Sequence, residues 1–227
     1  MADRPYSAAG ERITAILLSW QRPRNLPRIV AELARFRPID EIIVWNNNPE
    51  ARLDLPGATV INSPRNFLCF PRYCMAPLAS NETIWFQDDD LLLTGGRIES
   101  VRAAYLADTS RIYGIVGRDI VDGLYSADDV YGECDIVLGR AMLFHRRLLH
   151  HAFEPFGALP PDIREDDIIF SMASPGRHFA VDVASVEDLG SADEAALWRR
   201  SGHFERRQRA VDFMLAWRKQ ALRGGGG

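Results

Sequence analysis

Four short hydrophobic runs in the first half of the chain predict β-strands, because each is bounded by polar or turn-forming residues. They occupy residues 12–20, 41–45, 58–62 and 83–87. The intervening segments space their hydrophobic residues as helices do: one face carries Leu26, Ile29, Val30 and Leu33, and another, within 96–108, carries Ile98, Val101 and Tyr105. A third helix is expected over 72–80, where Pro77 must bend or end it. This alternation predicts an α/β fold with a mostly parallel central sheet flanked by helices.

The second half of the chain is less regular. We expect strands over 111–120, 135–146 and 178–185, with a polar loop at 121–133. Helices are expected over 165–174, 191–200 and 203–222. The pattern contains no repeat and no linker-like break. We therefore expect one domain over residues 1–223 and a disordered glycine tail at 224–227.

The composition excludes several classes of protein. The chain has 227 residues and a net charge of −4, which argues against general affinity for nucleic acid or anionic membrane. No hydrophobic run reaches the length of a transmembrane helix, and the start of the chain lacks the pattern of a signal peptide. Cys69, Cys74 and Cys134 do not have the spacing of a zinc or disulfide framework. We therefore expect buried, reduced thiols in a cytoplasmic protein.

A polar cluster follows each of the four strands expected in the first half. The clusters are "SWQRPRN" (19–25), "NNNP" (46–49), "NSPRN" (62–66) and "QDDD" (87–90). In an open parallel sheet, ligands bind beyond the carboxyl ends of the strands. We therefore expect the four clusters to converge on one binding site.

Three adjacent carboxylates, Asp88, Asp89 and Asp90, form the last of these clusters. They repel each other, and a divalent cation with oxygen ligands, Mg²⁺ or Mn²⁺, would cancel that repulsion. Such a cation typically shares its remaining positions with substrate phosphates and water. An acidic surface turn or a helix cap is the alternative, but the "LLLTGG" that follows does not suit a capped helix.

Arginines and asparagines accompany the same strand ends. Guanidinium groups match phosphate oxygens with paired donors, although any single arginine could serve only solubility; the candidates are Arg22, Arg24, Arg65 and Arg72. The asparagines could contact a base or ribose, or could close turns; they are Asn47, Asn48 and Asn66.

A second acidic cluster, Glu165, Asp166 and Asp167, opens the helix expected over 165–174. The helix dipole favours acids in a first turn, and this alone would explain the cluster. In a metal-dependent domain another interpretation is open. One cluster would hold the metal while the other faces the reacting carbon or the acceptor hydroxyl.

Several of these segments together resemble a known family. "ITAILLSWQRPRNLPRIVAEL" (13–33), "IDEIIVWNNNP" (39–49), "NSPRN" and "IWFQDDD" (84–90) are similar to segments of the exostosin-like glycosyltransferases, glycosyltransferase family 64. Looser similarities follow in "DIVLGRAMLFHRRLL" (135–149), "EDDIIFSM" (165–172) and "GHFERRQRAVDFM" (202–214). The resemblance covers residues 12–216, and "VWNNNP" with "QDDD" at this spacing is its most specific part.

The resemblance implies a GT-A fold, with a nucleotide-sugar-binding half at 12–107 and an acceptor-binding and catalytic half at 108–223. It implies a UDP-sugar donor, carrying an N-acetylhexosamine or hexose, and Mn²⁺ or Mg²⁺ bound by Asp90. It places six residues on the nucleotide or around the metal: Arg22, Asn47, Asn66, Arg72, Asp88 and Asp89. Asp167 matches the catalytic aspartate, Asp166 stands beside it, and Arg207 matches the partner arginine.

The expected reaction is transfer of the sugar to a hydroxyl of a glycan or glycolipid acceptor, with peripheral membrane association compatible with such an acceptor. The resemblance favours retention of anomeric configuration, but "EDD" is also similar to the acidic motif of inverting GT-A enzymes, so both outcomes stay open. Two other functions remain as alternatives. A sugar-1-phosphate nucleotidyltransferase would need a glycine-rich basic loop that "SWQRPRN" lacks, and an inactive sugar-nucleotide-binding module would not need acids in both clusters.

Overall fold

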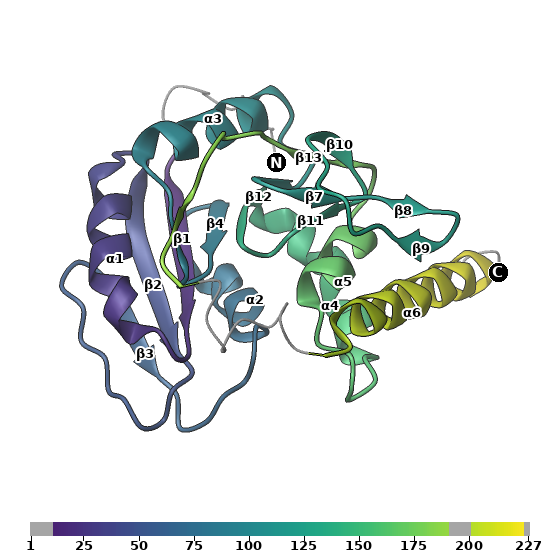
Figure 1. Ribbon diagram of the computed structural model, residues 1–227, viewed down its shortest axis with the longest axis horizontal. Coiled ribbons are helices and arrows are strands. Elements are labelled where there is room, and N and C mark those ends of the chain that lie inside the picture. The colour runs from purple at the N-terminus through teal and green to yellow at the C-terminus, as the bar shows by residue number, and fades with distance from the viewer. Residues whose placement is uncertain (1–10, 191–200, 225–227) are drawn as a thin grey trace, which may run out of the picture.

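An eight-stranded sheet forms the centre of the computed structural model, which describes residues 11–190 and 201–224 (Figure 1). The strand order is β10-β13-β6-β12-β4-β1-β2-β3. The four strands predicted in the first half are all present and mutually parallel: β1 (Ile13–Ser19), β2 (Ile39–Asn46), β3 (Thr59–Asn62) and β4 (Thr83–Gln87). β12 (Ala141–His145) runs antiparallel to β4 and connects them to the strands of the second half. The predicted α/β class with a mostly parallel sheet is confirmed.

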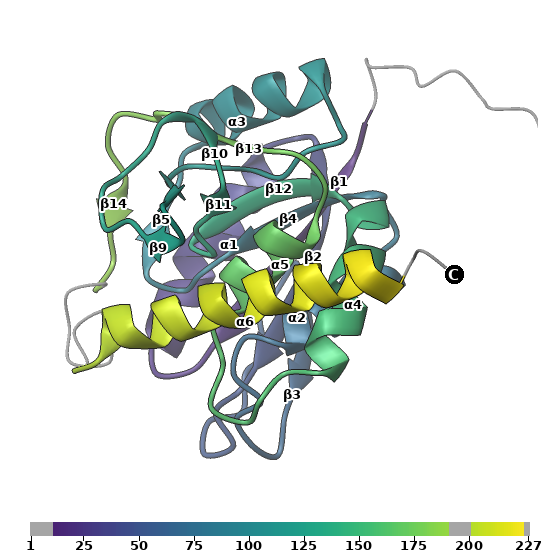
Figure 2. The same cartoon turned by 90° about the vertical axis from the view of Figure 1, so that its right-hand side faces the viewer.

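Alternation of side chains along the strands divides the core into two layers. Trp85 of β4 packs in the layer formed with α1 (Leu26–Arg35) and α3 (Gly95–Ala107). Its neighbours Ile84 and Phe86 pack in the opposite layer, with α2 (Pro71–Met75), α4 (Leu149–Gly157) and α5 (Asp166–Ala173). α6 (His203–Gly224) packs against α5 in a third cluster and crosses the front of the molecule in Figure 2.

The first-half helices also follow the prediction. α2 ends at Met75 and continues as a 3₁₀ turn, η2 (Ala76–Leu78), which contains Pro77. Pro77 therefore ends the α-helix, because a proline has no backbone N–H to donate. Two further 3₁₀ turns, η1 (Pro23–Asn25) and η3 (Arg146–Leu148), lead into α1 and α4.

The second-half strands differ from the prediction because they are short and change partners. The strand expected over 111–120 is three pieces. β6 (Tyr113–Gly114) belongs to the central sheet, β7 (Gly117–Arg118) pairs with β11 (Ile136–Val137), and β8 (Ile120–Val121) starts a hairpin. The strand expected over 135–146 is similarly broken between β11 and β12. β11 and β12 are both buried and mostly apolar, so the pattern of hydrophobic residues did not reveal the break between them.

The prediction of a plain loop at 121–133 is also wrong. β8 turns through Asp122 and Gly123, with φ of 52° and 82°, into β9 (Leu124–Tyr125). β10 (Gly132–Cys134) pairs with β13 (His178–Ala180), which is shorter than the strand expected over 178–185. The chain then returns as β14 (Glu187–Asp188) to pair with β5 (Leu91–Leu92), directly after the three aspartates.

Three smaller expectations have mixed outcomes. The expected disordered tail begins later than predicted, because Gly224 is still the last residue of α6. Residues 225–227 and the helix expected over 191–200 lie outside the described residues. All three cysteines are free, but only Cys134 is buried, since Cys69 is partly exposed and Cys74 is exposed. Within 11–190 and 201–224, none of the helices combines the length and apolar character that crossing a membrane requires.

Candidate active site

The carboxyl ends of the four parallel strands lie in one row. Ser19 of β1 pairs with Asn46 of β2, Asn46 pairs with Asn62 of β3, and Leu17 pairs with Gln87 of β4. The loops that follow these residues therefore leave the sheet at one edge. Contacts join the loop after β4 to the loop after β1, and the loop after β3 to the end of β2, so the four clusters lie along one edge, as predicted. Their use as one binding site remains a prediction.

The loop after β4 is held against the loop after β1. The Trp20 N–H donates to Asp89 Oδ2 at 3.2 Å, and Arg22 Nη1 lies 3.5 Å from Asp89 Oδ1 and 3.6 Å from Asp90 Oδ2. Asn25 Nδ2 donates to the carbonyl oxygens of Asp89, at 2.8 Å, and Leu189, at 2.9 Å. Burial raises the pKa of Asp89 despite these donors. Arg22 thus lies at the carboxylates of two adjacent aspartates.

Asn47 and Asn66 close turns in the structure. Asn47 is 3% exposed; its Oδ1 accepts from Phe67 N and Trp45 Nε1, both at 3.0 Å, and its Nδ2 donates to Leu68 O at 2.8 Å. Asn66 Oδ1 accepts from Leu68 N at 2.7 Å, and Leu68 has a φ of 61°. These bonds fix the loop after β3 against the end of β2. Of the two interpretations of these asparagines, the geometry shows turn closure, and contact with a nucleotide remains a prediction.

Arg72 connects the two acidic clusters. This buried side chain lies at the start of α2. Its Nε and Nη2 donate to Asp166 Oδ2 at 3.1 Å and 2.5 Å. Its Nη1 donates to Asp88 Oδ1 at 3.3 Å and to Gly139 O at 3.0 Å. Burial alone would lower the pKa of Arg72, but Asp166 and other neighbouring groups raise it well above its usual value. The loop after β4 and the first turn of α5 therefore belong to one charged cluster.

Asp167 pairs with Arg207 on the other side of the same turn. Its Oδ2 accepts from Arg207 Nη2 at 2.8 Å and from Gly139 N at 3.2 Å, and its Oδ1 accepts from Ile168 N at 2.9 Å. Burial would raise the pKa of Asp167, but Arg207 and the Gly139 N–H outweigh burial and lower the pKa. Asp167 is therefore ionised at neutral pH.

Asp88 lies near Arg72 and the other two aspartates of its loop. Loss of hydration raises its pKa to about 7, against the opposing effect of Arg72, and Asp90 and Asp89 add to the increase. The side chain nevertheless keeps 37% of its surface exposed. The Asp88 N–H donates to Arg140 O at 2.9 Å, which ties the acidic loop to the segment before β12.

Three residues of this cluster were not predicted from the sequence. Gly139 contacts both Arg72 and Asp167, and Tyr125 lies beneath Arg207 with its ring centroid 4.8 Å from the guanidinium carbon. Cys69, although partly exposed, lies among the acids, where loss of hydration and the neighbouring carboxylates raise its pKa well above the usual value. Long-range folding brings them here, and nothing in the neighbouring sequence marks them.

Other predicted candidates lie outside the cluster. Arg24 and Arg65 are exposed, and the Arg65 guanidinium lies over the Phe67 ring at 4.4 Å. Asn48 closes a turn to Glu50. Glu165 faces Arg206 at 3.5 Å rather than the paired arginines of the site.

The acidic loop has the oxygen ligands that a hard divalent cation needs. Among residues 11–190 and 201–224, no three His, Cys, Asp or Glu side chains are arranged to hold a metal unaided. Mg²⁺ or Mn²⁺ bound with substrate phosphates and water needs only one or two carboxylates from the protein. Asp90 and Asp88 can provide these, since an arginine lies near one oxygen of each, whereas both oxygens of Asp89 face donors, the Trp20 N–H and Arg22. The residues present therefore fit such an ion.

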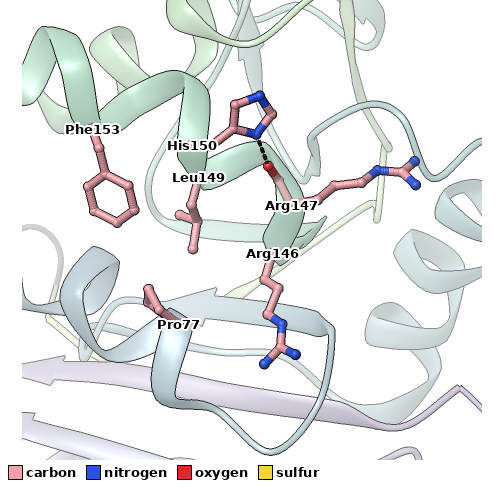
Figure 3. A pocket seen from close by; sticks show the side chains of 6 residues that line it. All are labelled: Pro77, Arg146, Arg147, Leu149, His150 and Phe153. Carbon is pink, nitrogen blue, oxygen red and sulfur yellow. Dashed lines mark hydrogen bonds between the residues drawn. The ribbon is translucent and has the colours of Figure 1, made fainter. Parts of the chain in front are cut away.

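A separate pocket of about 390 Å³ lies at the opposite end of β4 (Figure 3). It is lined by Pro77, Arg146, Arg147, Leu149, His150 and Phe153. The register places it there, because His145 pairs with Thr83, the first residue of β4, whereas the aspartates follow the last. This pocket is not part of the charged cluster.

The α/β fold is of the GT-A type, and comparison with solved structures agrees. The crystal structure of S. aureus TarS matches with a TM-score of 0.52 at 14% sequence identity, covering 77% of this chain and 36% of that one. At this identity the match shows the fold alone, and this chain spans only about a third of the length of TarS. No curated protein matches the sequence. The glycosyl transferase family 64 domain matches residues 13–223, so the chain belongs to that family.

Proposed function

We propose that the protein is a metal-dependent glycosyltransferase that moves a hexose or N-acetylhexosamine from a UDP-sugar to a hydroxyl of a glycan or glycolipid. The observation that carries this proposal is the bridge made by Arg72 between Asp88 and Asp166. It joins residues suited to a diphosphate and a cation to the Asp167–Arg207 pair, which suits a reacting centre. Membership of family 64 supports the transfer of a sugar.

Arg22 and Arg72 would bind the diphosphate of the donor. Each guanidinium carries five N–H donors, so Arg22 can keep its carboxylate partners and still donate to phosphate oxygens. Arg72 uses four of its donors on Asp166, Asp88 and Gly139, which leaves one for a phosphate oxygen. Asp90, with Asp88, would hold Mn²⁺ or Mg²⁺, and such an ion supplies positive charge against the departing diphosphate. Asp89 would fix the loop through Trp20 and Arg22, and Asn47 and Asn66 would shape the nucleotide-facing turn.

Asp167 would act at the reacting centre, with Asp166 and Arg207 holding it in place. A carboxylate with a lowered pKa is a weak base, because catalytic efficiency in proton abstraction follows basicity. The pairing with Arg207 therefore favours an electrostatic role, in which Asp167 stabilises positive charge at the anomeric carbon, over abstraction of the acceptor proton. This supports retention, and the configuration of the product would decide between the two outcomes.

Donor hydrolysis tests the proposal without knowledge of the acceptor. UDP-, GDP- and CMP-sugars would be incubated with the protein, with and without Mn²⁺, and release of the nucleotide measured. We expect Mn²⁺-dependent release of UDP. Binding of UDP without any hydrolysis would favour an inactive binding module, and release of pyrophosphate from UTP and a sugar-1-phosphate would favour a nucleotidyltransferase. We place the reaction in the cytoplasm, since three free cysteines suit a reducing compartment.

A further inference from the structure

Few contacts orient the guanidinium of Arg207. The side chain is buried and makes one hydrogen bond to a carboxylate, Asp167, at 2.8 Å. Its buried Nε has no hydrogen-bond partner among the described residues. The guanidinium carbon lies over the Tyr125 ring, 4.8 Å from the centroid, and the Tyr125 hydroxyl also interacts with the guanidinium. Arg207 is therefore positioned by Asp167 and by Tyr125.

Tyr125 belongs to an element that cannot hold its own position. The β8–β9 hairpin contains only two residue pairs, Ile120 with Tyr125 and Val121 with Leu124. Val121 and Leu124 are 58% and 63% exposed, so these side chains add little burial. An isolated two-stranded hairpin is at best marginally stable in water, and this one is shorter than most. Contacts from another element must fix it.

Gln208, the residue after Arg207 on α6, binds the hairpin backbone at the turn and at Tyr125, while Asp135 accepts from Ile120 N and the third core cluster packs against Ile120 and Tyr125. The Gln208 Oε1 accepts from Tyr125 N at 2.7 Å, and its Nε2 donates to Gly123 O at 3.0 Å and to Asp212 Oδ1 at 2.8 Å. A glutamine amide offers one acceptor and a donor, as a peptide group does. Gln208 therefore pairs with the hairpin backbone much as a neighbouring strand would.

We infer that Gln208 is a positioning residue for the transfer reaction. It fixes the hairpin on α6, so that the Tyr125 ring holds the Arg207 guanidinium against Asp167. Gln208 acts through Tyr125 and Arg207 and does not touch the substrate. The inference rests on the proposed function in one respect only, the catalytic use of the Asp167–Arg207 pair.

Nuclear magnetic resonance of the Arg207 Nε–H group tests the geometry independently of activity. A proton above an aromatic ring is displaced from the ordinary arginine resonance. The displacement is expected to persist in Tyr125→Phe, which keeps the ring, and to disappear in Tyr125→Leu. In Gln208→Ala the resonance is expected to move toward the ordinary position, because the ring is no longer fixed. An unchanged resonance in Gln208→Ala overturns the inference whatever the enzyme's activity.

Donor hydrolysis supplies the second readout. Gln208→Ala is expected to lower kcat about tenfold or more and leave the donor KM within about twofold, because a misplaced group affects the reacting centre more than donor binding. The acidic limb of the pH–rate profile of this variant is expected to shift to higher pH, because Arg207 no longer lowers the pKa of Asp167. Leu124→Ser, on the exposed side of the same hairpin, is the matched control and is expected to keep the wild-type kcat.

A double variant separates positioning from general damage. Because both substitutions act on one chain of contacts, Gln208→Ala combined with Tyr125→Leu should lose no more kcat than the worse single variant. Additive losses, or a change in KM alone, overturn the inference. Absence of hydrolysis by the wild-type protein would instead refute the proposed function, and the Arg207 resonance alone would then decide the role of Gln208.

Discussion

At the scale of single residues, Asp167 combines burial, a full negative charge and one charged partner. Asp167→Asn removes the charge but keeps the shape. We expect kcat for donor hydrolysis to fall about 100-fold or more, the scale of a lost electrostatic or acid–base group. The free energy of unfolding should fall by about 3 kcal/mol, because the buried Arg207 loses its counter-charge. UDP binding, measured below the melting transition, should change little.

Glu165→Gln is the matched control for Asp167→Asn. Glu165 precedes α5 and faces Arg206, so it should lose little kcat and only about 0.3–1 kcal/mol of stability. If acids at the start of α5 serve only the helix dipole, both variants would show such modest stability changes with near-normal turnover. That result would remove Asp167 from the reacting centre.

The role proposed for Asp90 gives a prediction about the metal that does not depend on Asp167. Asp90→Ala should abolish Mn²⁺-dependent turnover and weaken UDP binding, because the cation loses a carboxylate ligand near the diphosphate. Calorimetric titration of UDP with and without Mn²⁺ would compare wild type and variant. Equal UDP affinity in all four titrations would contradict the metal site at the loop after β4.

Arg22 and Arg24 offer a test within one turn of the chain. Arg22 lies at Asp89 and Asp90, whereas Arg24 is exposed. Arg22→Ala should raise the donor KM by an amount equivalent to about 1.5–3 kcal/mol, the worth of a charge-assisted hydrogen bond. Arg24→Ala should keep the wild-type KM. Equal donor kinetics in the two variants would place Arg22 outside the diphosphate site.

At the scale of elements, the turn between β11 and β12 gives the site its closest packing. A Cβ at Gly139 would lie 2.6 Å from Arg72 Nη2 and 3.4 Å from Asp167 Cβ. Gly139→Ala should therefore displace Arg72 and lower both UDP affinity and kcat, each by about tenfold. Gly96→Ala, where no atom lies within 4 Å of the added Cβ, should instead raise the free energy of unfolding by about 0.4–1 kcal/mol. Wild-type kinetics in Gly139→Ala would show that Arg72 tolerates the shift.

The same scale shows how far a sequence pattern can predict this structure. β1 and β4 are buried along nearly their whole length and β2 has a buried apolar centre, and the predicted bounds of all three differ from the observed ones by at most two residues. β6, β7 and β11 have only two residues each, and their partners are distant in the chain, so local hydrophobicity could not define them. The residues of the site also fall into a predictable and an unpredictable group. The acidic clusters and Arg72 are marked by charged residues at predicted element ends. Gly139, Tyr125 and Gln208 act through backbone groups and ring faces that no local pattern marks.

At the scale of the whole molecule, a buried histidine links the sheet to α5. His178 on β13 is 0% exposed; its Nε2 lies 2.7 Å from Ser171 O, and Ile112 N donates to its Nδ1 at 3.3 Å. A carbonyl only accepts, so Nε2 carries the proton and the ring is neutral. Burial lowers the pKa of His178 to about 4.

This lowered pKa predicts acid sensitivity with a definite sign. The unfolded chain binds a proton on His178 below about pH 6.5, but the folded protein does so only near pH 4. Stability is therefore complete above about pH 6.5 and falls toward pH 4 by up to about 1.4 kcal/mol per pH unit. His178→Gln should flatten the dependence of Tm on pH between 6.5 and 5. Parallel profiles for wild type and variant would assign the acid sensitivity to other groups.

The pairing of Asp167 with Arg207 also has a consequence during synthesis. Domains form from the N-terminus as the ribosome adds residues, and the parallel strands β1 to β4 with the three aspartates come first. Arg207 lies on α6 and emerges on the order of ten seconds after those aspartates. Under the proposed function, a nascent chain therefore acquires its donor-binding loops before its reacting centre, which is complete only when α6 docks.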